Sequence, residues 1–331
     1  MAENDIAGSL LDIRDLNVTL SRPGGWVPIV ENFSMSIKPG QRVGLVGESG
    51  SGKSVTARSI MRLHGPGLAS RAIEVTGGIS FKGRNLLALS EKEMRAVRGA
   101  EIGLVLQDPM TSLNPSMHIG DQVAEPLRIR GVGRKEARAR AVRTLDHLRI
   151  PRAAERMDAY PFEFSGGMRQ RICIAMAIIA EPALLIADEP TTALDVRIQE
   201  QVLEMIDGLS RELGMAVLLI THDLGVAAGY VDRVAVMYAG TKVEDAGVDE
   251  IFGRPRHPYT AALIDAVPRV DAEPVARLNV IAGTPSTPFD RAPGCPFEPR
   301  CPARMETCST IRPDLEPVAA GHEVRCLLDH P

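Results

Sequence analysis

Apolar and polar positions along this 331-residue chain follow two patterns that both predict β-strands. Residues 11–20 and 29–37 alternate apolar with polar side chains, which is typical of a strand with one buried face. Continuous apolar runs, in contrast, occupy residues 183–187, 216–220 and 234–237, and residues 42–46 and 102–106 are expected to be short buried strands. Continuous runs are typical of strands covered on both faces of a parallel sheet. The pattern therefore predicts an α/β fold.

Two stretches depart from this strand pattern. Between about residues 110 and 180, prolines separate helical pieces, and Ala137, Ala141 and Leu145 fall on one helical face. We interpret this stretch as an inserted helical subdomain. From about residue 255 onward, prolines and cysteines become frequent and the periodicity fades, which indicates a separate C-terminal segment.

A glycine-rich loop follows the short strand expected at residues 42–46 and precedes a helix expected over residues 54–63. Its residues are Gly47, Glu48, Ser49, Gly50, Ser51, Gly52, Lys53 and Ser54. Small residues let successive backbone N–H groups approach phosphates, and the helix N-terminus adds positive potential. We expect Lys53 to reach the β- and γ-phosphates of a nucleotide and the Ser54 hydroxyl to ligate Mg²⁺.

Four polar residues stand where apolar runs end. Asp188 can hold the Mg²⁺ shell, and Glu189, one residue later, can orient and deprotonate the attacking water. The Gln107 amide can reach Mg²⁺ and water, and the His222 imidazole can contact the γ-phosphate and hold Glu189 in place. Each residue alone would more often be a solvated or structural group. Their order behind a phosphate loop predicts a site that hydrolyses a nucleotide.

A second anion site is indicated by Ser165, Gly166 and Gly167, which precede a helix expected to begin at Arg169. A helix N-terminus attracts anions, and glycines allow close approach of the backbone. One chain that binds one nucleotide does not need two phosphate sites. We therefore expect this segment to contact the γ-phosphate bound to the glycine loop of a partner.

Four of the five cysteines lie within the last 37 residues, namely Cys295, Cys301, Cys308 and Cys326. In a reducing cytosol, clustered cysteines indicate a metal site before disulfides. Four thiolates suit a tetrahedral Zn²⁺ or an iron–sulfur cluster, and disulfides or free thiols are the third alternative. The spacing alone does not decide among them. The fifth cysteine, Cys173, is expected to be a buried helix thiol without chemistry.

Composition and charge narrow the class of protein. The chain is 44% hydrophobic and 24% charged with a net charge of −4, so a broad nucleic-acid surface is not indicated. No apolar run approaches about 20 residues, and the acidic start has no signal-peptide core. We expect a cytoplasmic chain that reaches a membrane only through a partner.

Together, these motifs resemble the ATP-binding-cassette (ABC) ATPases over about residues 10–250. The resemblance implies an ABC-type nucleotide-binding domain at residues 1–254, with a RecA-like parallel sheet core, an antiparallel β subdomain and the helical subdomain at about 110–180. It also implies that residues 165–168 are the signature, Asp195 the aspartate loop and His222 the switch histidine, beside the roles already given. The site would bind ATP and Mg²⁺.

Two features depart from the general cassette pattern. The signature opens with Phe164 and has Met168 where glutamine is more usual. The aromatic residue that stacks on adenine is not evident, because Leu20 stands at one expected place. Trp26 is our candidate for that contact.

A closer resemblance is to the ATP-binding subunits of oligopeptide and dipeptide importers, and it covers nearly the whole chain. It rests on the segments at residues 108–115, 164–171, 257–260 and 294–301. It implies an oligopeptide-transporter-type C-terminal domain at residues 255–331. It also favours a [4Fe–4S] cluster over zinc at the four cysteines, where the metal would order a segment too small to build its own core.

The resemblance further implies the motor subunit of an ABC importer, bound peripherally at the cytoplasmic face of the membrane. ATP binding would close two cassettes, the permease would switch, and hydrolysis would reset it. The expected partners are a second ABC ATPase subunit that forms a heterodimer, two integral-membrane permease subunits and an extracytoplasmic substrate-binding protein, with no nucleic acid.

Other functions remain open at this point. A soluble ABC ATPase acting on nucleic acid or ribosomes typically carries two cassettes or coiled-coil arms, whereas this chain has one cassette and no long heptad run. Intact Lys53, Glu189 and His222 argue against a structural subunit that does not hydrolyse ATP. The transported substrate could be a peptide, a nickel chelate, an opine or glutathione.

Overall fold

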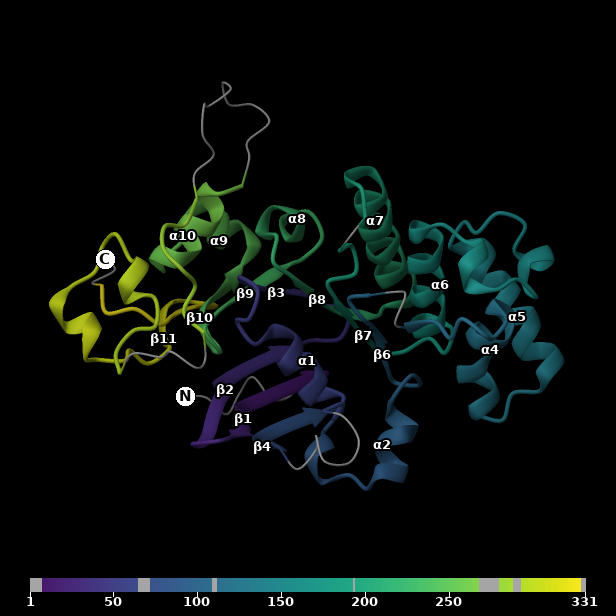
Figure 1. Ribbon diagram of the computed structural model, residues 1–331, viewed down its shortest axis with the longest axis horizontal. Helices are drawn as coiled ribbons and strands as arrows, with labels where there is room; N and C mark the ends of the chain where they lie inside the picture. Colours follow the sequence, from purple (N-terminus) through teal and green to yellow (C-terminus); the bar gives the residue numbers. More distant parts are fainter. Residues whose placement is uncertain are drawn as a thin grey trace. The chain divides into compact units, whose positions relative to one another are not determined.

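The computed structural model describes residues 8–64, 72–108, 112–192, 194–267, 280–287 and 293–328. The chain divides into two compact units (Figure 1). The first unit contains residues 1–37, 42–87 and 220–331, and the second contains residues 38–41 and 88–219. The first unit thus joins the beginning of the chain to its end.

An antiparallel sheet in the first unit has the strand order β2-β1-β4-β5. Its strands are β1 (Leu11–Arg22), β2 (Gly25–Ile37), β4 (Ile73–Phe81) and β5 (Arg84–Asn85). Leu11 pairs with Ile37 on one side and with Phe81 on the other, and all three side chains are buried. The alternation predicted for residues 11–20 and 29–37 is confirmed, since buried side chains alternate along these strands with half-buried or exposed ones.

The first unit also contains five strands in the order β11-β12-β10-β9-β3. These are β3 (Arg42–Val46), β9 (Arg233–Tyr238), β10 (Thr241–Gly247), β11 (Glu316–Ala319) and β12 (His322–Val324). β3 and β9 are parallel, and the other pairs are antiparallel. The helices of this unit are α1 (Lys53–Ile60), α8 (Leu224–Ala228), α9 (Val248–Gly253) and α10 (Pro258–Asp265).

The C-terminal segment is more regular than its sequence indicates. It supplies α10, and β12 pairs with β10 through Glu244↔Val324. Strands β11 and β12 are only four and three residues long, so neither produces a recognisable apolar pattern. Sheet pairing with a preformed neighbour, rather than its own hydrophobic pattern, orders this part of the chain.

The second unit contains neighbouring strands β8 (Ala216–Thr221, whose last two residues fall in the first unit), β7 (Leu184–Asp188) and β6 (Ile102–Val105). β6 and β7 are parallel, as the continuous apolar runs predict. The helices are α2 (Glu91–Val97), α4 (Ile119–Ile129), α5 (Arg134–His147), α6 (Gly166–Ile178) and α7 (Val196–Leu213). Short 3-10 turns lie at Ala153–Arg156 and Pro161–Glu163 in this unit, at Glu298–Arg300 and Glu306–Ser309 in the first unit, and at Leu86–Ala88 where the two units meet in the sequence.

Helices α4, α5 and α6 contact one another and form the helical part expected between the strands (Figure 1). α6 begins at Gly166, three residues earlier than the sequence indicates, because the Ser165 hydroxyl accepts a hydrogen bond from the Met168 N–H and caps the helix. α7 begins at the cap Asp195 and ends at Gly214, whose φ of 61° suits glycine. Within the described part of the chain, no helix is long and apolar enough to cross a membrane.

Candidate functional site

The phosphate loop lies between β3 and α1, the strand–loop–helix context that the sequence predicts. Two of its positions require glycine. A Cβ atom on Gly47 would lie 2.1 Å from the backbone oxygen of Met237, and Gly52 has φ 103° as the residue that precedes α1. At Gly47, the backbone of the loop lies so close to β9 that there is no room for a side chain.

Lys53 is the first residue of α1 and is only 3% exposed. Its ammonium group donates hydrogen bonds to the carbonyl oxygens of Gly47 at 2.7 Å and Glu48 at 2.9 Å. The lysine is thus held inside the loop by the loop's own backbone. A positive charge at the N-terminus of a helix, surrounded by a glycine-rich backbone, is suited to binding phosphates.

In the second unit, Glu189 follows β7 and is held by two donors. The Gln107 amide nitrogen lies 2.7 Å from the carboxylate oxygen Oε2, and the Thr192 hydroxyl donates to the same oxygen at 2.9 Å. Glu189 has φ 47°, which is uncommon for a residue other than glycine and marks backbone strain of a kind found at functional sites. The structure therefore brings together two of the predicted residues, Gln107 and Glu189, and fixes the carboxylate.

Asp188 ends β7 and is 2% exposed. Buried carboxylates are rare unless they are paired or bind a cation, so this position suits a Mg²⁺ ligand. Ser54, in the first turn of α1, is half-buried, and Gln107 is exposed after β6. Carboxylate, hydroxyl and amide oxygens are ligands that Mg²⁺ accepts, so the chemistry of the predicted set fits this ion.

The predicted signature lies at the start of α6, where Ser165 and Gly166 are exposed. Gly167 is closely approached, since a Cβ atom there would lie 2.9 Å from the Cγ2 atom of Ile198. An exposed helix N-terminus with two glycines can accept an anion brought by another molecule.

Three further predicted residues occupy exposed positions. The Asp195 carboxylate accepts the Ile198 N–H at 3.0 Å and so caps α7. His222 is exposed directly after β8. Trp26, in β2 opposite Ser21, is 52% exposed, which leaves its ring available for stacking.

The four C-terminal cysteines line one small cavity together with His257 and Phe297. Burial raises the pKa of Cys295 to about 11 and also raises the pKa values of Cys301 and Cys326, so these thiols stay protonated at neutral pH. Among the described residues, no group of three or more His, Cys, Asp or Glu side chains is placed so that it could hold a metal ion. The cysteines therefore share a cavity but would have to draw closer to ligate one metal.

Cys173 is 6% exposed in α6, which confirms the predicted burial. Burial raises the pKa of its thiol to about 12. A protonated, enclosed thiol is a poor nucleophile and a poor metal ligand.

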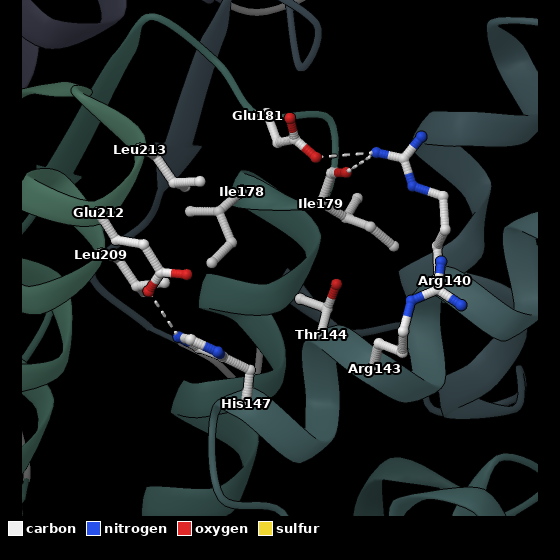
Figure 2. Close-up of a pocket in the computed structure, with 10 residues that line it drawn as sticks. All are labelled: Arg140, Arg143, Thr144, His147, Ile178, Ile179, Glu181, Leu209, Glu212 and Leu213. Atoms are coloured by element: carbon white, nitrogen blue, oxygen red, sulfur yellow. Dashed lines mark hydrogen bonds and ion pairs between the residues drawn. The ribbon is translucent and has the colours of Figure 1, made fainter.

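A separate pocket lies among α5, α6 and α7 of the second unit (Figure 2). His147 faces Glu212 across it at 3.3 Å, and the Arg140 guanidinium lies 3.2 Å from Glu181. Its polar lining is largely satisfied by these pairs, and none of the residues expected to bind ATP lines it. It is a junction between helices rather than the predicted site.

Comparison with known proteins decides the family. The family described as "ABC transporter" matches residues 30–192, and "Oligopeptide/dipeptide transporter, C-terminal region" matches residues 243–308. The chain is 46% identical to the oligopeptide transport ATP-binding protein OppD of Salmonella typhimurium, over 97% of this chain and 94% of that protein. The chain belongs to the ABC transporter family of ATP-binding proteins. The predicted resemblance is thereby confirmed.

Other similar proteins support the same family. It is 48% identical to the dipeptide transport ATP-binding protein DppD of Bacillus subtilis, over 96% of this chain and 94% of that protein. In fold, it resembles a dimeric post-hydrolysis structure of the ATP-binding cassette MJ0796 bound to ADP and Pi. The TM-score is 0.63 at 26% identity, and the match covers 72% of this chain and 98% of that one. The ABC chain is thus an ATPase with the cassette fold.

Sequence reasoning about the ABC chain missed three residues that contact the predicted site. Thr192 holds Glu189, while Tyr259 and Arg300 contact Glu48 of the phosphate loop. Thr192 lies three residues after Glu189, a spacing that could have suggested the hydrogen bond. Nothing in the local sequence links Arg300 to a loop 252 residues away.

Proposed function

We propose that this chain is the ATP-hydrolysing subunit of a membrane importer for oligopeptides or dipeptides. The observation that carries ATP hydrolysis is Glu189, a carboxylate at the end of a buried strand that Gln107 and Thr192 hold in one orientation. Peptide import is supported by relatives at 46% and 48% identity whose names specify oligopeptide and dipeptide transport, and by the C-terminal match at residues 243–308.

The residues divide the chemistry among them in this proposal. Lys53 and the backbone N–H groups of the loop bind the β- and γ-phosphates of ATP. Ser54, Asp188 and Gln107 hold Mg²⁺, which neutralises charge on the phosphate oxygens when bound. Glu189 orients the attacking water and accepts its proton. In the same proposal, His222 contacts the γ-phosphate, and Trp26 stacks on adenine.

The exposed signature residues Ser165, Gly166 and Gly167 complete the site of a partner rather than that of their own chain. The partner in this proposal is a second ABC ATPase subunit that forms a heterodimer, with Asp195 near their contact. Two permease subunits and an extracytoplasmic substrate-binding protein complete the assembly, which places this chain on the cytoplasmic face of the membrane. Support comes from the exposure of the α6 N-terminus and from the named relatives.

The four C-terminal cysteines hold a [4Fe–4S] cluster in this proposal, with Zn²⁺ as the alternative. Support comes from the donor set, because four thiols lining one cavity match the ligand number of either group. Binding would release the thiol protons and tie Cys295, Cys301, Cys308 and Cys326 together, which stabilises this segment.

The metal proposal is tested by anaerobic purification of the full chain. We expect brown protein with iron and acid-labile sulfide near four per chain, and loss of both in the Cys301→Ser variant with ATP binding retained. The matched control is Cys173→Ser, which should keep the metal. Stoichiometric zinc without iron would replace the cluster by the alternative, and absence of all metal with four reactive thiols would reject the site.

The transport proposal is tested by reconstitution. The chain is expressed with candidate permease subunits and a second ABC ATPase subunit, and the complex is placed in proteoliposomes with a peptide-binding protein. We expect ATP hydrolysis that rises when the binding protein carries a peptide. A chain that purifies without membrane subunits and hydrolyses ATP in response to nucleic acid or ribosomes would contradict the proposal and favour the soluble alternative.

A further inference from the structure

Arg300 links the C-terminal segment to the phosphate loop. It ends the 3-10 turn Glu298–Arg300, directly before Cys301, and its side chain is 3% exposed. Its two terminal nitrogens contact the two carboxylate oxygens of Glu48, at 2.6 Å and 3.1 Å. This is a bidentate ion pair to the second residue of the phosphate loop, which is the geometry that guanidinium and carboxylate groups form most strongly.

Arg300 is itself held firmly. It donates hydrogen bonds to the backbone oxygens of Ala282 at 2.9 Å and Ile281 at 3.2 Å, and it contacts the Tyr238 hydroxyl at 3.3 Å. Burial by itself would lower the pKa of Arg300, but its bonds to Glu48 and Tyr238 raise the pKa overall. The guanidinium is therefore a charged and fixed anchor.

A second residue from the same part of the chain contacts the Glu48 backbone. The Tyr259 hydroxyl accepts the Glu48 N–H at 2.9 Å, and the Tyr259 ring packs on Tyr238 and Phe297 at 4.6 Å and 5.3 Å between centroids. Burial raises the pKa of Tyr259, so the hydroxyl stays neutral. Both the side chain and the backbone of Glu48 are thus held by residues that follow β9 in the sequence.

Glu48 in turn is bonded to the residue expected to bind phosphate, because its carbonyl oxygen accepts from the Lys53 ammonium at 2.9 Å. A continuous set of contacts runs from Arg300 through Glu48 to Lys53. We infer that Arg300 is a positioning residue for ATP: it fixes Glu48, and through it the loop backbone and Lys53, in the arrangement that receives the phosphates. The C-terminal segment would then have two roles: it would set the ATP affinity of the cassette through Arg300, and it would hold the proposed metal.

Loss of the ion pair between Arg300 and Glu48 should change the affinity for ATP and not the turnover number. When the ion pair is lost, the loop samples other arrangements, and ATP must select the competent one, which raises its dissociation constant. Glu189 and its partners lie in the other unit of the chain and are unchanged, so the turnover number at saturating ATP should hold. A variant that merely unfolds part of the protein would lower the number of binding sites instead, with the affinity of the remainder intact.

The test compares three variants of the full chain by equilibrium ATP binding. Arg300→Met should weaken binding roughly tenfold, because charge-assisted hydrogen bonds are lost, with one site per chain retained. Arg300→Lys keeps the charge but loses the bidentate geometry, and it should fall between wild type and Arg300→Met. The matched control is Arg304→Met in the same segment, whose side chain is 63% exposed and pairs with Glu298; it should bind ATP as wild type does.

Glu48→Gln provides a second route that leaves the C-terminal segment intact. It should weaken ATP binding to a similar extent, and the double variant Arg300→Met/Glu48→Gln should be no weaker than the worse single variant, since both act through one contact. In the assembled transporter, the KM for ATP should rise in Arg300→Met while kcat stays within about twofold.

The inference is overturned if both Arg300→Met and Glu48→Gln bind ATP within about twofold of wild type, or if their effects multiply in the double variant. An effect of Arg304→Met equal to that of Arg300→Met would also overturn it. These outcomes concern ATP affinity alone. Failure of the transport proposal would appear separately, as wild-type chain that shows no peptide-stimulated hydrolysis.

Discussion

Replacing Glu189 with glutamine removes a base and preserves the contacts that hold the residue. In the structure, Gln107 and Thr192 both donate to the same carboxylate oxygen, at 2.7 Å and 2.9 Å. A glutamine at this position can offer one oxygen to both donors, so the side chain should keep its orientation. The second carboxylate oxygen becomes an amide nitrogen, which cannot accept a proton from water.

The size of the effect follows from that change. General base catalysis typically contributes about 10²–10⁴-fold, so turnover should fall by roughly 10²-fold or more, equivalent to about 2.7 kcal/mol in the barrier. ATP binding should stay within about twofold of wild type, because the oxygen that accepts from Gln107 and Thr192 is kept. We therefore expect Glu189→Gln to accumulate as an ATP-bound, closed pair of cassettes.

The assay is phosphate release by the assembled transporter, run beside equilibrium ATP binding. Glu200→Gln is the matched control, since Glu200 is exposed on α7 and its replacement should leave both quantities unchanged. Turnover of Glu189→Gln within about threefold of wild type would refute the assignment of Glu189 as the base. Loss of ATP affinity equal to the loss of turnover would show instead that the residue supports binding.

Three further predictions test other parts of the molecule. Ser165→Arg, at the exposed start of α6, should leave ATP binding to the isolated chain nearly unchanged and impair closure and transport in the assembly; equal loss of affinity in the isolated chain would contradict a role toward the partner's nucleotide. Cys173 should react with iodoacetamide at pH 8 roughly 10³-fold more slowly in the folded chain than after unfolding, because burial raises its pKa from 9.0 to about 12 and fewer molecules carry the thiolate. The labelling rate of the folded chain, measured by mass spectrometry of the Cys173 peptide, should rise with pH up to about 12. Equal labelling rates of the folded and unfolded chain at pH 8 would contradict the prediction. Gly47→Ala should destabilise the chain by roughly 1–3 kcal/mol in denaturant unfolding and weaken ATP binding, because its Cβ atom would lie 2.1 Å from the Met237 backbone oxygen. Gly208→Ala, where the added Cβ would meet nothing within 4 Å apart from its chain neighbours and the nearby backbone of its own helix α7, is the control and should not destabilise the chain.

Features that depend on nearby residues could be predicted from the sequence. The phosphate loop is one example, since the short strand before it and the helix after it are local patterns. The helix α1 runs from Lys53 to Ile60, one residue earlier at its start and three residues shorter at its end than expected. The parallel pairing of β6 and β7 follows from the same reasoning, because each strand is an uninterrupted apolar run that must be covered on both faces. The burial of Cys173 is a third example, since its neighbours in α6 are apolar.

The C-terminal segment shows where such reasoning stops. Its cysteines are conspicuous in the sequence, but β12 is only three residues long and is stabilised by pairing with β10. Strand pairing between distant segments depends on the neighbouring strand, so the local sequence of either segment does not predict it. The sequence therefore indicated an irregular segment where the structure has an edge of a sheet.

Residue types at strand ends and in the glycine loop were thus determined by the sequence alone, because their chemistry and spacing are local. Only the tertiary structure decided which distant groups hold them: Gln107 on Glu189, across 82 residues, and Arg300 on Glu48, across 252. Such contacts form only when the packing of other elements brings two chain segments together, so the free energy that orders them is distributed over the whole unit. The phosphate loop can be recognised from eight consecutive residues, but Arg300, which positions it, lies near the other end of the chain.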